Sequence, residues 1–143
     1  MKIFHHSNIP LFLSVVFVLS FFGCAGTERF SKNDSEVNKN VIEITEGIAS
    51  YYSDEFHGRK TANGETYNMY ALTAAHKTYP FNTKVRVTNL SNGKSVILRI
   101  NDRMPVYNKR LIDISFQAAK ELNMITKGIT EVKLEVLEWG DDK

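Results

Sequence analysis

The side chains of this sequence that could do chemistry are carboxylates and histidines beside strand-like runs. The acids near predicted strand ends are Asp54, Glu55, Glu65, Asp102 and Asp113, and the nearby histidines are His57 and His76. Cleavage of a glycosidic bond needs a carboxylic acid to protonate the leaving oxygen, usually with a second group that steadies positive charge on the sugar. Asp102 directly follows the apolar run 95–100, so it is our candidate acid, and His76 is a candidate hydrogen-bond partner for its carboxylate.

Other chemistries find little support in the sequence. It has no G-x-S-x-G motif, no H-E-x-x-H motif and only one cysteine, which removes the usual patterns of α/β-hydrolases and zinc sites. It lacks a phosphate-binding glycine loop, and a formal net charge of +2 is too balanced to indicate a nucleic-acid-binding surface. We therefore expect no metal, no organic cofactor and no nucleic-acid partner.

Each candidate also has an ordinary structural interpretation. An aspartate after a strand commonly closes an Asx-turn, so the local pattern at Asp102 favours a turn. His76 by itself favours a hydrogen-bonded structural role, and Glu65, in the run NGE, a solvated loop position. Asp113 lies between apolar neighbours and could satisfy backbone groups near Ser115. Four aromatic side chains could either pack in the core or stack on sugar faces, and the sequence does not decide between the two roles: Tyr51, Tyr52, Phe56 and Tyr67.

The elements that must position these residues are six short strand-like runs. They cover residues 47–52, 71–76, 84–89, 95–100, 110–114 and 130–137. Apolar and polar residues alternate in 84–89 and 130–137, and the turn signal SNG after 84–89 predicts a hairpin. One helix is predicted over 116–124, with Ser115 as its N-cap. The predicted fold is mainly β, a compact six-stranded barrel with one or two short helices, and the long polar loop 54–69 is a candidate functional loop.

The beginning of the chain predicts export. Lys2 is followed by an almost wholly apolar run at 9–23, which is shorter than the roughly 20 residues that a membrane-spanning helix needs. A basic start, a short apolar run and a small residue are typical of a secretory signal, so we interpret 1–23 as a signal peptide. An uncleaved N-terminal anchor helix is the alternative.

Cys24, the only cysteine, follows this segment directly. The run FFGC resembles the bacterial lipoprotein box, in which the cysteine is acylated, although Phe21 stands where the box usually has leucine. We interpret 24–46 as an acylated cysteine with a flexible polar linker, and 47–140 as the barrel domain. A signal peptide followed by an unmodified cysteine is the alternative.

The predicted barrel resembles one family closely. The runs GIASYYSDEFHGRKTANGE, LTAAHKT, KVRVTNLSNGKSV and NDRMP occur in the order found in rare lipoprotein A, a family of the double-psi β-barrel superfamily. LIDISFQAAKELNM and EVKLEVL continue the match, so the resemblance spans about residues 47–137. It implies a six-stranded double-psi β-barrel.

The resemblance also implies an activity. It is that of an endolytic lytic transglycosylase, which cleaves peptidoglycan between N-acetylmuramic acid and N-acetylglucosamine and leaves a 1,6-anhydro product without using water. The family's catalytic aspartate falls on Asp102, its essential histidine on His76 and a further active-site acid on Glu65. In these roles Asp102 is the general acid and then the base, His76 orients Asp102, and Glu65 helps to place the sugar. A non-catalytic peptidoglycan-binding lipoprotein is the alternative, and an envelope scaffold is another.

The same resemblance implies partners and a location. The expected partners are peptidoglycan glycan strands, a membrane reached through the N-terminal lipid anchor, and cell-division proteins. The expected location is the bacterial cell envelope, at the periplasmic face of the outer membrane. One residue departs from the family, because Met104 stands where the usual motif, Asn-Asp-Arg-Gly-Pro, has glycine. If that glycine adopts a positive φ, a methionine there would be strained.

Overall fold

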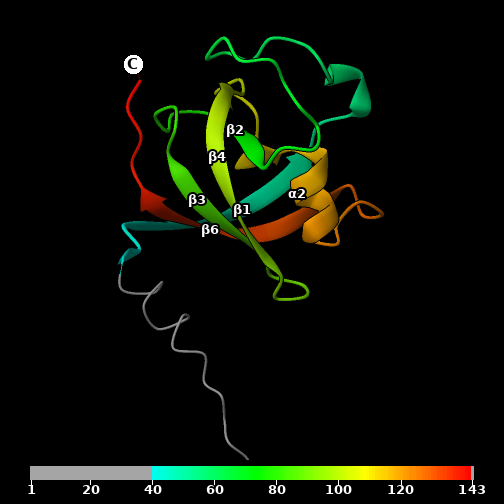
Figure 1. Cartoon of the computed structure of the whole chain (residues 1–143). Coiled ribbons are helices and arrows are strands. Elements are labelled where there is room, and N and C mark those ends of the chain that lie inside the picture. The colour runs from blue at the N-terminus through cyan, green and yellow to red at the C-terminus, as the bar shows by residue number, and fades with distance from the viewer. Residues whose placement is uncertain (1–39, 143) are drawn as a thin grey trace, which may run out of the picture. The chain divides into compact units, whose positions relative to one another are not determined.

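The computed structural model describes residues 40–142 (Figure 1). In chain order their elements are β1 (Glu43–Tyr51), η2 (Asp54–Phe56), β2 (Thr73–His76), β3 (Lys84–Asn89), β4 (Ser95–Arg103), β5 (Ile112–Ile114), α2 (Phe116–Glu121) and β6 (Ile129–Glu138). Each predicted run overlaps one strand. Among the described residues, no helix has the length and apolar character needed to cross a membrane. The predictions for the signal peptide and for Cys24 lie outside these residues.

The six strands of residues 40–142 close into a barrel, in the order β1-β5-β2-β4-β3-β6. β1 pairs with β5 and β2 with β4 in parallel, and the other four neighbouring pairs are antiparallel. The predicted hairpin is confirmed, since Lys84 to Thr88 of β3 pair in antiparallel register with Arg99 to Ser95 of β4. Because the barrel is closed, none of these strands is an edge strand with a row of unpaired N–H and C=O groups that could pair with another chain and cause aggregation.

Several predicted boundaries are wrong, those of β1, β4 and α2 by three residues or more. β1 begins at Glu43 rather than at residue 47, because residues 43–46 of the predicted linker pair with β6, with Glu43 opposite Val136 and Glu46 opposite Lys133. α2 ends at Glu121 rather than at residue 124, because Asn123 has a φ of 53°. A residue in this left-handed region ends a helix, and asparagine tolerates it better than most residues do. The predicted N-cap is confirmed, since Ser115 Oγ accepts a hydrogen bond from the Ala118 amide.

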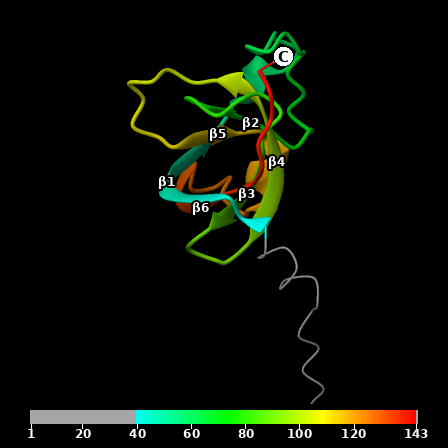
Figure 2. The same cartoon turned by 90° about the vertical axis from the view of Figure 1, so that its left-hand side faces the viewer.

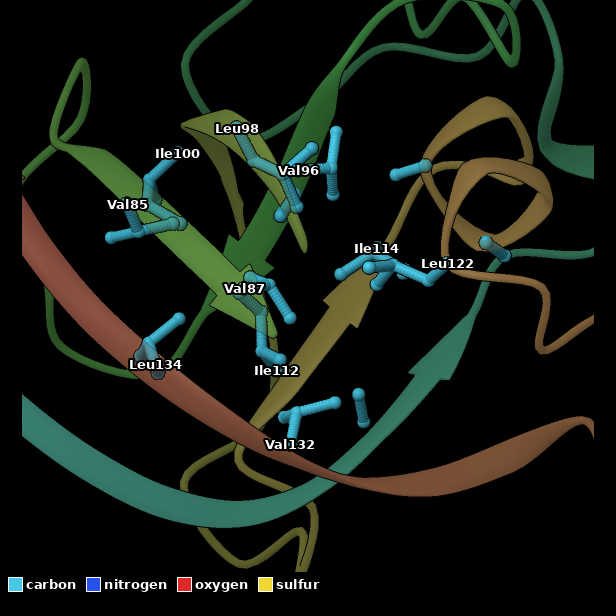
Figure 3. Packing of buried hydrophobic residues seen from close by; sticks show 14 of the residues in the cluster. Val85, Val87, Val96, Leu98, Ile100, Ile112, Ile114, Leu122, Val132 and Leu134 are labelled. Carbon is cyan, nitrogen blue, oxygen red and sulfur yellow. The ribbon is translucent and has the colours of Figure 1, made fainter. Parts of the chain in front are cut away.

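The core fills the interior of the barrel. Inward-facing side chains of β3, β4, β5 and β6 point toward one another, and Leu122 at the end of α2 closes one side (Figure 3). Most are fully buried Val, Leu or Ile, and burying each such side chain contributes about 1.5–3 kcal/mol before entropy is counted. These strands thus form a rigid support for the segments that connect them.

Two of those segments lie at the same end of the barrel. The loop 54–69 and the connection 104–111 both lie away from the β3–β4 turn, as two perpendicular views show (Figures 1 and 2). β4 ends at Arg103, where the second connection begins. The candidate acid therefore lies at the end of the barrel from which both long connections project.

Candidate active site

Asp102 reaches the outer face of the barrel through an irregularity in β4. Val96, Leu98 and Ile100 face the core, so strict alternation would place Asp102 inside with them. The pairing with β2 shifts instead, since Ala74 lies opposite Ile100 and the next residue, Ala75, lies opposite Asp102. One extra residue in β4 is a β-bulge, and it turns the side chains beyond it to the other face. The carboxylate therefore points outward and not into the core.

The Asp102 carboxylate accepts three hydrogen bonds. Its Oδ1 accepts from the backbone amides of Ala62 and Arg103, each at 2.8 Å, and its Oδ2 accepts from the Tyr52 hydroxyl at 2.8 Å. The Arg103 amide belongs to the next residue, whereas an Asx-turn binds the amide two residues on, and the other two bonds reach across 40 and 50 residues of sequence. Asp102 is thus held from three directions, and the predicted Asx-turn is wrong.

A cleft of about 510 Å³ opens beside Asp102. Its lining includes the aromatic residues Tyr52, Phe56 and Tyr107, of which Tyr107 is 86 % exposed. The charged residues of the lining are Arg59, Lys60, Asp102, Arg103, Arg110 and Asp113. A polar cleft with exposed aromatic faces suits a carbohydrate, because sugars offer both hydroxyl groups and apolar ring faces. Tyr107 was not among our candidates, and its place in a loop near a proline and an asparagine gave no periodic signal.

Asp113 lies in the same cleft. Ala75 of β2 pairs with Asp102 on one side and with Asp113 on the other, so the two aspartates share a face with their Cα atoms roughly 10 Å apart. The Asp113 carboxylate accepts hydrogen bonds from Ser50 Oγ at 2.6 Å and from Arg110 Nε and Nη2 at 2.7 and 2.9 Å. The interpretation that Asp113 satisfies backbone groups near Ser115 is wrong, because its partners are side chains.

Glu65 is not a free loop acid. Its two oxygens accept hydrogen bonds from Nη1 and Nη2 of Arg99, both at 2.8 Å, and from the side-chain amides of Asn63 and Asn101, both at 3.0 Å. The Arg99 hydrogen bonds, with those of Asn101 and Asn63, lower the pKa of Glu65 to about 2. Glu65 therefore stays ionised and fastens the loop 54–69 to β4. The same loop supplies the Ala62 amide that binds Asp102.

His76 is brought to the same end of the barrel but does not bind Asp102. Its Nδ1 accepts hydrogen bonds from the backbone amides of Thr78 and Tyr79, at 3.3 and 3.1 Å, and its ring stacks on Tyr79 with centroids 3.7 Å apart. Residues alternate along β2, so His76 lies on the face opposite Ala75 and Asp102. The predicted His76–Asp102 hydrogen bond is therefore wrong. The side-chain hydrogen-bond donor to the Asp102 carboxylate is Tyr52 instead.

The protonation state of His76 follows from its contacts. Burial, and then the charges of Lys77 and Arg103, lower the pKa of His76 to about 4. A nitrogen that accepts two amide hydrogens carries no proton, so the imidazole is neutral with its proton on Nε2. In this state His76 holds the turn that follows β2.

Met104 is accommodated without backbone strain. Among the non-glycine residues described, positive φ occurs only at Asn82 and Asn123, so Met104 does not need the conformation that favours glycine. Its side chain is buried beside the cleft, with 5 % exposed. The predicted strain at this position is therefore wrong, because methionine fits the backbone path that follows Arg103.

The remaining candidates divide between packing and the cleft. Tyr67 is buried against Tyr52, with ring centroids 4.9 Å apart, whereas Phe56 is 38 % exposed and lines the cleft. The Tyr51 hydroxyl donates to the Ile125 carbonyl at 3.2 Å, on the core side of β1. Within residues 40–142 no three His, Cys, Asp or Glu side chains gather as metal ligands.

Comparison with known proteins identifies relatives of the barrel. A family model described as lytic transglycolase matches residues 44–134. A protein of Campylobacter jejuni named endolytic peptidoglycan transglycosylase RlpA is 55% identical over 100 residues, which are 70% of this chain and 36% of that protein. The protein of that name from Pseudomonas aeruginosa is 50% identical over 113 residues, 79% of this chain and 32% of its own length. The chain thus spans about a third of these relatives.

Solved structures share the fold at low sequence identity. A Streptomyces papain inhibitor matches with a TM-score of 0.56 and 20% identity, over 68% of this chain and 97% of its own. A Clavibacter michiganensis expansin in complex with cellohexaose matches with a TM-score of 0.55 and 16% identity, over 67% of this chain and 51% of its own. Together with the family match and the closed six-stranded sheet, these likenesses confirm the predicted double-psi β-barrel.

Proposed function

Because the chain belongs to the lytic transglycolase family, we propose that it is an endolytic peptidoglycan transglycosylase. Its proposed substrate is the bond between N-acetylmuramic acid and N-acetylglucosamine within a glycan strand, and its product ends in a 1,6-anhydro sugar. The names of the relatives support this proposal, although the chain spans only about a third of their length. The observation that carries it is the outward Asp102 carboxylate, which lies in a cleft with aromatic walls.

In this mechanism Asp102 carries out both proton transfers. Its carboxyl group gives a proton to the glycosidic oxygen as the bond from that oxygen to C1 breaks. The 6-hydroxyl oxygen of the same muramic residue then bonds to C1, and its proton passes to the Asp102 carboxylate. The acid is restored and no water is consumed.

The contacts of Glu65 and His76 support positioning roles for both residues. Glu65 is committed to Arg99 and two asparagines, so we assign it the task of holding the loop that brings the Ala62 amide to Asp102. His76 holds the turn after β2 through its Nδ1. Each Glu65 oxygen already accepts two hydrogen bonds, so direct contact with the sugar, one of its predicted roles, would compete with them.

The test is digestion of purified glycan strands, with mass spectrometry of the products. We expect anhydro sugars from the wild-type protein and a loss of at least about 1,000-fold in rate for Asp102→Asn, because the general acid is removed. Asp54→Asn, at an exposed loop aspartate, is the matched control and should retain activity. Glycan binding by the wild type without any anhydro product would overturn the proposal in favour of a peptidoglycan-binding protein.

The location is proposed from the sequence of the first residues. We infer that Cys24 is acylated after removal of residues 1–23 and that the chain is anchored in the bacterial envelope, at the periplasmic face of the outer membrane. Metabolic labelling with palmitate, compared between the wild type and Cys24→Ser, tests this: equal labelling of both would contradict it. Association with cell-division proteins is a further proposal, and cross-linking in dividing cells would show whether any are captured.

A further inference from the structure

We infer that Tyr52 is a catalytic residue of the proposed reaction, acting through the hydrogen bond from its hydroxyl to Asp102 Oδ2. This inference rests on the proposed function, since it concerns the same carboxylate. It assigns to Tyr52 the task of stabilising the charge on Asp102 after the carboxyl group has given its proton to the leaving oxygen.

The two oxygens of Asp102 have different surroundings. Oδ1 accepts two backbone amides, from Ala62 and Arg103, at 2.8 Å each. Oδ2 has one protein partner among the described residues, the Tyr52 hydroxyl at 2.8 Å. Because Oδ1 is occupied by two donors that cannot move away, Oδ2 is the oxygen with room to carry and transfer a proton. Tyr52 thus touches the reacting atom.

The position of the Tyr52 hydroxyl is fixed by packing. Tyr52 comes directly after β1, and its backbone amide donates to the Ile114 carbonyl at 3.1 Å. Its ring lies against Tyr67 at 4.9 Å and against Phe56 at 5.8 Å between centroids. A side chain packed against two rings, on a backbone that is itself hydrogen-bonded to β5, loses little further entropy when it donates to the carboxylate, so the bond is preorganised.

Tyr52 remains a donor throughout the range in which the protein would work. Burial, together with the nearby charges of Asp102 and Asp113, raises the pKa of the Tyr52 hydroxyl well above its usual value. The hydroxyl therefore keeps its proton, and no proton passes from Tyr52 to the substrate. Its contribution is to favour the charged form of its partner over the protonated form.

The consequence for catalysis follows from the proton cycle. When Asp102 gives its proton to the glycosidic oxygen, Oδ2 becomes negatively charged and its hydrogen bond from Tyr52 strengthens. Hydrogen bonds to charged groups contribute about 1.5–3 kcal/mol, which corresponds to roughly 10- to 100-fold in rate if they form fully in the transition state. Removing the hydroxyl should therefore lower kcat by at least about 10-fold.

The charges that face Asp102 bear on the pH dependence of this step. They come from the loop 54–69, from β4 and from the β5 side of the cleft, and they are Arg59, Lys60, Arg103, Arg110 and Asp113. Arg110 is paired with Asp113, and Arg103 with Asp142. Tyr52→Phe leaves all of them in place, so a change in pH dependence would report the lost hydrogen bond alone.

The experiment compares wild type, Tyr52→Phe and Tyr51→Phe in glycan digestion across pH. We expect Tyr52→Phe to lower kcat at least about 10-fold with little change in KM, and to move the alkaline limb of the pH–rate profile upward by about one pH unit. The control Tyr51→Phe loses a hydroxyl that bonds the Ile125 carbonyl, and it should stay within about twofold of the wild type. A kcat for Tyr52→Phe within twofold of the wild type, or an unmoved alkaline limb, would overturn the inference.

A second measurement does not depend on turnover. In protein labelled with carbon-13 at the aspartate carboxyl groups, the chemical shift of the Asp102 carboxyl carbon at neutral pH should differ between Tyr52→Phe and the wild type, because Oδ2 has lost its donor. An equal chemical shift in the two proteins overturns the inference whether or not product forms. Absence of product from the wild type would instead count against the proposed function, so the two failures are distinguishable.

Discussion

His76 should make the stability of this protein depend on pH between about 6.5 and 4. In the folded protein its Nδ1 accepts two backbone amides and its pKa is about 4, against about 6.5 for a histidine in an unfolded chain. As the pH falls, the unfolded chain therefore binds a proton before the folded protein does. The stabilisation from His76 is complete above pH 6.5 and is lost progressively down to pH 4.

The size of the effect follows from the two pKa values. Their difference corresponds to about 3 kcal/mol, of which about 2 kcal/mol is lost by pH 5. For a domain of about 100 residues, 1 kcal/mol shifts the melting temperature by roughly 4–8 °C, so the change is easily measured. Urea unfolding followed by tryptophan fluorescence at several pH values gives the free energy of unfolding directly.

His76→Asn separates this contribution from those of the carboxylates. The asparagine Oδ1 can replace the imidazole Nδ1 as acceptor and cannot gain a proton in this range. The variant should therefore lose less stability than the wild type between pH 7 and pH 5. His57→Asn is the matched control, because His57 Nδ1 also accepts a backbone amide, from Met69, but its side chain is exposed. If His76→Asn and the wild type lose equal stability over this interval, the assignment of His76 as a neutral acceptor is refuted.

Two further perturbations test the hold of Glu65 on its loop and the close packing at Gly140. Glu65→Gln should lower the free energy of unfolding by about 1 kcal/mol at pH 7, a value reduced because the Glu65 side chain is 41% exposed. The folded pKa of Glu65 is about 2, so the stability lost in Glu65→Gln should shrink as the pH falls from 4.5 toward 2, as urea unfolding would measure. Glu131→Gln, at an exposed glutamate, is the control. A loss of stability that is independent of pH, or equal to that of the control, would contradict this. Gly140→Ala should cost more than about 2 kcal/mol, because a Cβ there would lie 1.9 Å from the Phe81 carbonyl oxygen. Gly93→Ala is the control, because a Cβ there meets nothing within 4 Å although φ is +73°, and it should cost only about 1 kcal/mol. Equal melting temperatures for the two variants would contradict the expected clash between the new Cβ at residue 140 and the Phe81 carbonyl oxygen.

The fold followed from local sequence patterns because its strands are short and regular. Alternation in 84–89 and 130–137 predicted β3 and β6, and the SNG turn predicted the hairpin that joins β3 to β4. The early start of β1 was missed because residues 43–46 are polar on both faces except for Ile44. Only pairing with β6 makes a strand of them, and that pairing is formed by residues about 90 positions away.

The sequence named candidate site residues but not their contacts. Asp102 was a candidate from its place after an apolar run, the family resemblance gave Asp102 and Glu65 their expected roles, and the structure links the loop that carries Glu65 to β4 through Asn101. The partner of Asp102 was missed because Tyr52 is 50 residues distant and lies in a run that also fits core packing. The sequence contains one usable signal, since two adjacent tyrosines at the end of a strand must point to opposite faces. One of them, Tyr52, was therefore bound to leave the core.

The bulge in β4 explains how one strand serves both the core and the site. Val96, Leu98 and Ile100 require their alternate positions inside the barrel, and an unbroken strand would bury Asp102 after them. A buried carboxylate without a charged partner would cost several kcal/mol, so the shift in register removes a penalty and exposes a functional group in the same step.

The same geometry explains why Met104 is tolerated. The carboxylate of Asp102 is held by the Tyr52 hydroxyl and by the amides of Ala62 and Arg103, all of which come before residue 104 in the chain. None of these contacts depends on the conformation of residue 104, whose φ lies outside the positive range and whose side chain is buried. A glycine at this position would add freedom to the unfolded chain without adding a contact to the acid. The departure from the family motif therefore changes the packing behind the cleft and leaves the hold on Asp102 unchanged.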